Sequence, residues 1–147
     1  MLRPMAETRD LPPTRWRRFG DHHLMFTEAD TPVPEQVWDP VMVALDDAEL
    51  KGCLSIVGGD GLARLTKPQW EVSSSIINER GFPVAVITSH RVTRSMVKAA
   101  SWIGGNIRAY CWAELDAALA FIGVPALQRD ACRIVAEQLR AGSCSAL

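Results

Sequence analysis

The segment TSHRVTRS is the part of this sequence in which residue types and spacing most clearly suggest chemistry. Arg91 and Arg94 fall in the first two turns of an expected helix, where the partial positive charge of the helix N-terminus disfavours cations. Together with free backbone N–H groups, two such arginines can bind an anion, either a phosphate or a partner carboxylate. The alternative is an internal ion pair with Asp60 or Glu114, which is the more common state of surface arginines. Both interpretations stay open from the sequence alone.

Patterns for catalysis are weak. Ser89, His90 and Asp60 are the residue types of a nucleophile–base–acid set, but a serine and a histidine that are adjacent in sequence are poorly placed to act on each other. The G-x-S-x-G pattern is absent, and the loop GGDGLARLTK lacks the final GK[ST] of a phosphate-binding loop. We therefore expect no enzymatic activity.

Patterns for metal binding are weak as well. His22 and His23 would point to opposite faces of a strand and so could not bind one ion together, and we expect both to be solvated residues at the edge of a turn. The four cysteines show no CxxC spacing. The sequence thus predicts no metal site and no cofactor.

Composition limits the class of protein. The 147 residues are 48% hydrophobic and 22% charged, which is typical of one soluble domain with a hydrophobic core. The net charge of −1 favours neither nucleic acid nor an anionic membrane surface. No apolar run reaches the roughly 18 residues that a transmembrane helix needs, and the cysteine usage suits a reducing compartment. We expect a cytoplasmic protein.

The elements that position these residues can be read from the order of apolar and turn segments. Residues 1–14 are expected to form a flexible arm, residues 15–142 one domain and residues 143–147 a flexible tail. Gly20-Asp21 predicts the turn of a β-hairpin, and Asp39-Pro40 predicts the start of a helix that continues to about Leu50. Further along the chain, the patterns predict strands at 53–57, 83–88 and 107–112, and helices at 68–79, 91–103, 113–122 and 126–141. In the last helix, the expected core-facing residues are Leu127, Ala131, Ile134, Val135 and Leu139.

This order, ββαβαβαβαα, predicts an α/β fold. Strands that are apolar on both sides and alternate with helices form a central, mostly parallel sheet with helices on its faces, here extended by the N-terminal hairpin. Five residues are expected in strands, the first four of them buried: Leu54, Ile56, Val84, Val86 and Ile107.

In such a sheet, ligands and partners meet the carboxyl ends of the strands. Three loops would meet there, and the residues expected to line the resulting rim are Asp60, Arg64, Ser89, Arg91, Arg94, Trp112 and Glu114. Trp70 and Trp102 fall at helix positions that could face outward, and an exposed tryptophan would indicate an interaction surface.

The stretch INERGFPVAVITSHRVTRSMVKAASWIGGNIRAYCWAELDAALAFIG resembles a STAS domain, the fold of bacterial anti-sigma-factor antagonists. The resemblance extends from Cys53 to Ile122, and the N-terminal hairpin is also consistent with it. It implies a bacterial regulatory protein that binds a protein partner. The regulatory members open one helix with a phosphorylated Ser or Thr in an Asp-Ser-Ser-Gly-like motif, whereas here no serine follows Asp60-Gly61. The nearest hydroxyl that opens a helix is Thr66, which is either a phosphoacceptor or a plain N-cap.

The sequence therefore predicts a non-enzymatic regulatory or protein-interaction module that binds a protein partner through the strand-end rim and the adjacent helix. The alternative is a sensor or carrier that binds an anionic small molecule or a nucleotide at the same rim. A fitted pocket of about 300 Å³ or more would favour the small ligand. A flat rim with an exposed Trp or Leu would favour the protein partner.

Overall fold

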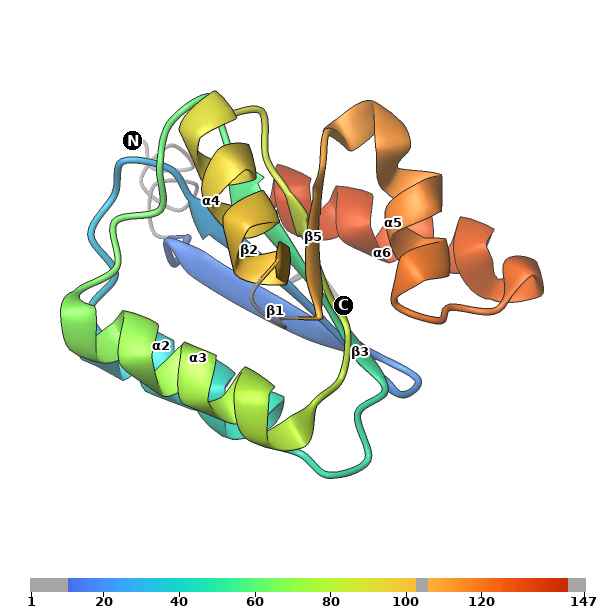
Figure 1. The fold of residues 1–147 in the computed structure, drawn as a ribbon, viewed down its shortest axis with the longest axis horizontal. Coiled ribbons are helices and arrows are strands. Elements are labelled where there is room, and N and C mark those ends of the chain that lie inside the picture. The colour runs from blue at the N-terminus through green and yellow to red at the C-terminus, as the bar shows by residue number, and fades with distance from the viewer. Residues whose placement is uncertain (1–10, 103–105, 143–147) are drawn as a thin grey trace, which may run out of the picture.

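A computed structural model describes residues 11–102 and 106–142, with side chains for 11–98 and 106–142 (Figure 1). The elements follow one another as β1 (Thr14–Phe19), β2 (His22–Glu28), α2 (Glu35–Leu45), β3 (Gly52–Gly58), α3 (Lys67–Arg80), β4 (Val84–Ile87), α4 (Arg91–Trp102), β5 (Ile107–Tyr110), the 3₁₀ turn η1 (Trp112–Glu114), α5 (Leu115–Phe121), the 3₁₀ turn η2 (Ala126–Gln128) and α6 (Arg129–Ala141). This confirms the predicted order ββαβαβαβαα and the α/β class.

The sheet has the strand order β1-β2-β3-β4-β5. β1 pairs antiparallel with β2 as the first arm of the hairpin, and β2 to β5 are parallel. Because neighbouring parallel strands follow one another in the chain, right-handed crossovers place every connecting helix on the same face. Accordingly α2, α3 and α4 lie on one side of the sheet, and α5 and α6 lie on the other (Figure 1).

Two hydrophobic layers result, one on each face of the sheet. Leu54 and Ile56 of β3 face α5 and α6, whereas Val84 and Val86 of β4 face the layer that contains α2. All four are buried, and Ile107 lies in β5, so the predicted strand residues are confirmed.

The helix α3 begins and ends where its sequence predicts. Thr66 is the N-cap, with Pro68 in the first turn. Gly81 ends the helix in the left-handed conformation at φ 73°, which glycine adopts without steric cost.

The predicted bounds of α2 were wrong. The helix begins at Glu35, so that Pro40 lies inside it, and it ends at Leu45 instead of Leu50. The earlier start buries Trp38 one turn before Val41, and this packing outweighs the hydrogen bond that Pro40 cannot donate.

The side chain of Asp47 favours the end of α2 at Leu45. The backbone N–H of Glu49 donates to the carboxylate of Asp47 at 2.8 Å, and this local turn competes with helical hydrogen bonding.

The prediction of solvated histidines was also wrong, since both are buried. β2 lies between β1 and β3 and is covered on both faces, so neither of its two side-chain directions leads to water. His22 lies with Nε2 2.8 Å from the carbonyl oxygen of Ile122. His23, on the opposite face, stacks against Trp16 with ring centroids 5.4 Å apart.

In α6 the predicted core stripe is wrong at three positions. Leu127, Ala131 and Ile134 are exposed, and the small side chains of Cys132 and Ala136 face the sheet instead. Both sets of residues have helical spacing. The set with the small side chains of Cys132 and Ala136 lets the helix approach the sheet more closely. Thr14, which the sequence placed at the end of the arm, belongs to β1 and is buried. Residues 1–10 of the predicted arm, and the predicted tail 143–147, lie outside the described residues.

The buried sheet predicts the effect of one substitution. Val86→Asp would place an unpaired carboxylate in the core, which should prevent soluble folding. Soluble yield and thermal unfolding followed by circular dichroism measure this, with Val43→Asp on the exposed side of α2 as the control. A Val86→Asp protein that melts like the unchanged one would contradict the assignment of this strand.

His23 predicts a pH dependence of stability. Burial, and secondly the charge of Arg18, lower the pKa of His23 from 6.5 to about 4. Between pH 6.5 and pH 4 the unfolded chain binds more protons than the folded one. The free energy of unfolding therefore has its full value above pH 6.5 and is lowered by His23 protonation below it. It should decrease by up to about 3 kcal/mol as the pH falls to 4. Urea unfolding across this range should show a smaller decrease for His23→Gln, and an unchanged decrease would assign the effect to other groups.

Candidate functional site

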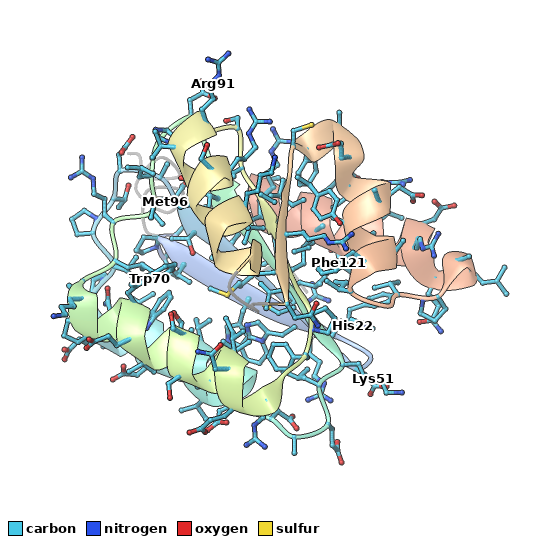
Figure 2. The ribbon with its side chains drawn as sticks, in the orientation of Figure 1. His22, Lys51, Trp70, Arg91, Met96 and Phe121 are labelled. Atoms are coloured by element: carbon cyan, nitrogen blue, oxygen red, sulfur yellow. The ribbon has the colours of Figure 1, made fainter. Side chains whose placement is uncertain are left out.

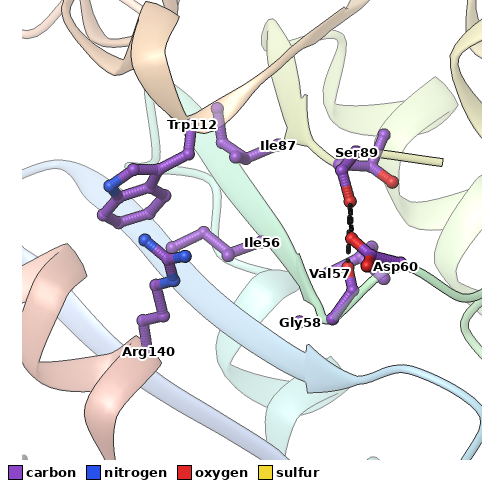
Figure 3. Close-up of a pocket in the computed structure, with 10 residues that line it drawn as sticks. Ile56, Val57, Gly58, Asp60, Ile87, Ser89, Trp112 and Arg140 are labelled. Atoms are coloured by element: carbon purple, nitrogen blue, oxygen red, sulfur yellow. Dashed lines mark hydrogen bonds between the residues drawn. The ribbon is translucent and has the colours of Figure 1, made fainter.

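The carboxyl ends of β3 and β4 border a hollow of about 190 Å³ (Figure 3). Its lining comes from β3, β4, the loops that follow them, η1 and α6, and consists of Ile56, Val57, Gly58, Gly59, Asp60, Ile87, Thr88, Ser89, Trp112 and Arg140. This is the place in the sheet where the sequence predicts the rim.

One side of the hollow is acidic. The hydroxyl Oγ of Ser89 lies 2.9 Å from Asp60 Oδ1 and 3.1 Å from the carbonyl oxygen of Gly59, to which it can donate (Figure 3). This contact joins the loop after β3 to the loop after β4. Gly58 and Gly59 shape the loop, because a side chain at Gly58 would collide with the ring of Phe26, and Gly59 has a φ of 70°.

The opposite side is basic and aromatic. The guanidinium of Arg140 lies over the indole of Trp112, 4.3 Å from the ring centroid (Figure 3). The last turn of α6 is held in place by Arg15, whose Nε and Nη2 donate to the carbonyl oxygen of Leu139 at 3.2 and 2.8 Å. Arg140 forms no ion pair with any carboxylate in the described part of the chain.

The structure brings together three of the seven predicted rim residues: Asp60, Ser89 and Trp112. Arg64 lies outside the hollow and pairs with Asp30 at 3.7 Å. Sequence reasoning missed Arg140, since it belongs to the last helix and no local pattern links it to the loops after β3 and β4.

Arg94 and Glu114 interact within the protein. The carboxylate of Glu114 accepts a hydrogen bond from the backbone N–H of Cys111 at 2.9 Å. This bond, a second one from the Cys111 thiol and the charge of Arg94 keep the pKa of Glu114 below its usual range. Arg91 is different: it is exposed, it projects away from the sheet at the start of α4 (Figure 2), and it forms no ion pair with the residues that the structure describes.

Thr66 has the geometry of an N-cap. Its Oγ1 accepts a hydrogen bond from the backbone N–H of Gln69 at 3.2 Å, and the Gln69 side chain accepts one from the backbone N–H of Thr66 at 2.9 Å. A role as phosphoacceptor stays a prediction.

The described residues do not assemble a Ser–His–Asp set. The Nδ1 of His90 accepts a hydrogen bond from the backbone N–H of Thr93 at 3.3 Å, so this ring nitrogen caps α4, while the Ser89 hydroxyl is engaged with Asp60. Burial raises the pKa of the Cys53 thiol to about 12 and that of Cys132 to about 11, which makes both poor nucleophiles.

The described residues contain no group of three or more His, Cys, Asp or Glu side chains placed to hold a metal ion. Nor do they include a helix whose length and apolar character would let it span a membrane.

Comparison with known proteins adds little. No protein-family model matches the chain, and no curated protein is similar to it. A crystal structure of a probable enoyl-CoA hydratase from Mycobacterium smegmatis aligns with 90% of this chain and 88% of its own, at 12% identity and a TM-score of 0.39. A similarity this distant carries no argument about function.

The cap at Thr66 can be tested directly. Thr66→Ala removes the acceptor for the Gln69 N–H and should lower the free energy of unfolding by about 1 kcal/mol, whereas Thr66→Ser keeps the oxygen and should have little effect. Urea unfolding at pH 7 measures both. Equal stability of the alanine and serine variants would show that the cap contributes nothing.

Proposed function

We propose that this protein is a non-enzymatic interaction module that binds an acidic segment of a protein partner through the outer face of α4. The observation that carries the proposal is the exposure of two apolar side chains one turn apart on this helix: Val92 is 54% and Met96 57% exposed. On another face of the same helix, Val97 is buried against the sheet, so burial of the helix does not require the outer pair.

The charge of α4 indicates the chemistry of the partner. Its sequence, RVTRSMVKAASW, contains three basic residues and no acidic one. Arg91 precedes Val92 and lacks an ion pair within the described chain, so a carboxylate on a partner would satisfy it. An acidic segment with one or two apolar side chains fits this combination.

Nearby residues extend the surface. Trp70 of α3 is 56% exposed, and Figure 2 shows it on the same side of the molecule as Met96. Leu62, in the loop after β3, is also exposed. Exposed tryptophan is enriched in binding hot spots, which supports a partner that spans α4 and reaches toward α3.

The size of the hollow supports the partner over a large ligand. At about 190 Å³ it is smaller than the 300–1,000 Å³ pockets that hold drug-sized molecules, which disfavours a nucleotide carrier. The resemblance of residues 53–122 to STAS domains also supports the proposal, because regulatory members of that family bind protein partners.

Photocrosslinking can identify the partner. A benzophenone amino acid at Met96 should capture a specific protein in the native host, and the same group at Val43, exposed on α2, should not. The captured protein, once purified, should bind the unmodified chain with an affinity that decreases as salt is raised.

Substitutions then test the surface with that purified partner. Arg91→Glu and Met96→Ser should each weaken binding at least tenfold, while Val43→Ser should leave it unchanged. Arg91→Glu should leave thermal stability equal or slightly higher, because glutamate suits a helix N-terminus better than arginine does. Equal binding by all three variants would place the functional surface elsewhere on the molecule. Arg94 is not used in this test, since its interaction with Glu114 would mix stability with binding.

A further inference from the structure

The lining of the hollow at the strand ends includes a cation, Arg140, whose N–H groups form no ion pair with the described residues. The Arg140 guanidinium carbon lies 4.3 Å from the centroid of the Trp112 ring, and a guanidinium over an aromatic face can still use its N–H groups to bind a ligand. Within the described chain no carboxylate accepts from it. Paired donors in one plane match the two oxygens of a carboxylate.

A second donor lies in the wall. Thr88 belongs to the lining of the hollow, and it is buried at 1% exposure. Its Oγ1 accepts a hydrogen bond from the backbone N–H of His90 at 3.1 Å, and its own O–H donates to none of the described residues. Buried hydroxyl groups normally donate their proton to a hydrogen-bond acceptor, and an acceptor bound in the hollow would supply one for Thr88.

Part of the lining is apolar and could contact a short alkyl chain. Ile56 and Ile87 supply apolar wall beside Arg140 and Trp112 (Figure 3). The volume of about 190 Å³ is below that of pockets for drug-sized molecules, which suits a ligand of only a few carbon atoms.

We propose that the hollow binds a short-chain aliphatic monocarboxylate, with the carboxylate on Arg140 and the Thr88 hydroxyl and the alkyl chain against Ile56 and Ile87. The carboxylate of Asp60 lies across the hollow from Arg140 (Figure 3) and would repel a second negative charge. The site should therefore select a monoanion over a dianion.

Binding can be measured by titrating ¹⁵N-labelled protein with butyrate at pH 7 and constant ionic strength. We expect saturable shifts of the Trp112 indole N–H and the backbone N–H of Gly59, with a Kd on the order of 1 mM, as expected of so small a ligand. Butanol and butylamine, which keep the alkyl chain without the carboxylate, should give no saturable shift at these groups. Shifts of equal size with butanol, or none with butyrate up to about 50 times that Kd, would overturn the proposal.

Variants separate the charge from the fold. Arg140→Gln should weaken butyrate binding at least tenfold, and Arg140→Lys should weaken it less, because lysine keeps the charge without the paired donors. Arg64→Gln is the matched control: it removes an arginine in the loop after β3 that lies outside the hollow, and should leave the Kd unchanged. If Arg64→Gln weakened butyrate binding as much as Arg140→Gln, or if Arg140→Gln left it unchanged, the assigned site would be contradicted.

Asp60 provides a test of selectivity that does not depend on Arg140. Succinate should bind at least tenfold more weakly than butyrate to the unchanged protein, and Asp60→Asn should remove most of that difference. A difference that persists in Asp60→Asn would show that Asp60 does not set the selectivity. Arg91, Val92 and Met96 are not among the residues that line the hollow, so either proposal can fail without the other.

Discussion

The whole arrangement depends on a sheet whose inner strands are apolar on both faces. In β3, Cys53 faces one layer of helices and Leu54 the other, and both are buried, so neither face can be left to water. Because β2 to β5 are adjacent in chain order, the connecting helices α2, α3 and α4 all fall on one face. The second face must be covered by chain that follows the last strand, and this is the role of α5 and α6.

This constraint also builds the hollow. The layer of α5 and α6 ends near the carboxyl edge of the strands, where Arg140 meets Trp112 at 4.3 Å. The loops after β3 and β4 meet at the same edge because parallel strands end together, and there Ser89 contacts Asp60. One side of the hollow thus comes from the connections within the sheet, and the other from the covering layer added after it.

Within the part of the chain that the structure describes, the same geometry leaves one face of α4 uncovered. Val97 packs on the sheet, and Val92 and Met96, on another face of the helix, contribute little to that packing. The basic residues of α4 have different surroundings: the charge of Arg94 helps to lower the pKa of Glu114, whereas Arg91 extends into solvent. A helix that the fold needs on only one side can present the other to a partner, which is the basis of the proposed function.

The sequence by itself determined the class, the order of elements and the sharpest helix ends, because these follow from local signals. Strand segments apolar on both sides, the cap at Thr66 and the glycine at position 81 act within a few residues of themselves. The same local signals predicted Asp60, Ser89 and Trp112 at the strand ends, since the carboxyl edge of a parallel sheet follows from the order alone.

The features that the sequence did not predict were decided by packing between segments that are distant in the chain. Because Trp38 packs in the core, α2 begins earlier than predicted, at Glu35. Because β2 is covered on both faces, His23 is buried. The choice between two apolar stripes on α6, which brings Arg140 to the hollow, depends on how closely small side chains let a helix approach the sheet.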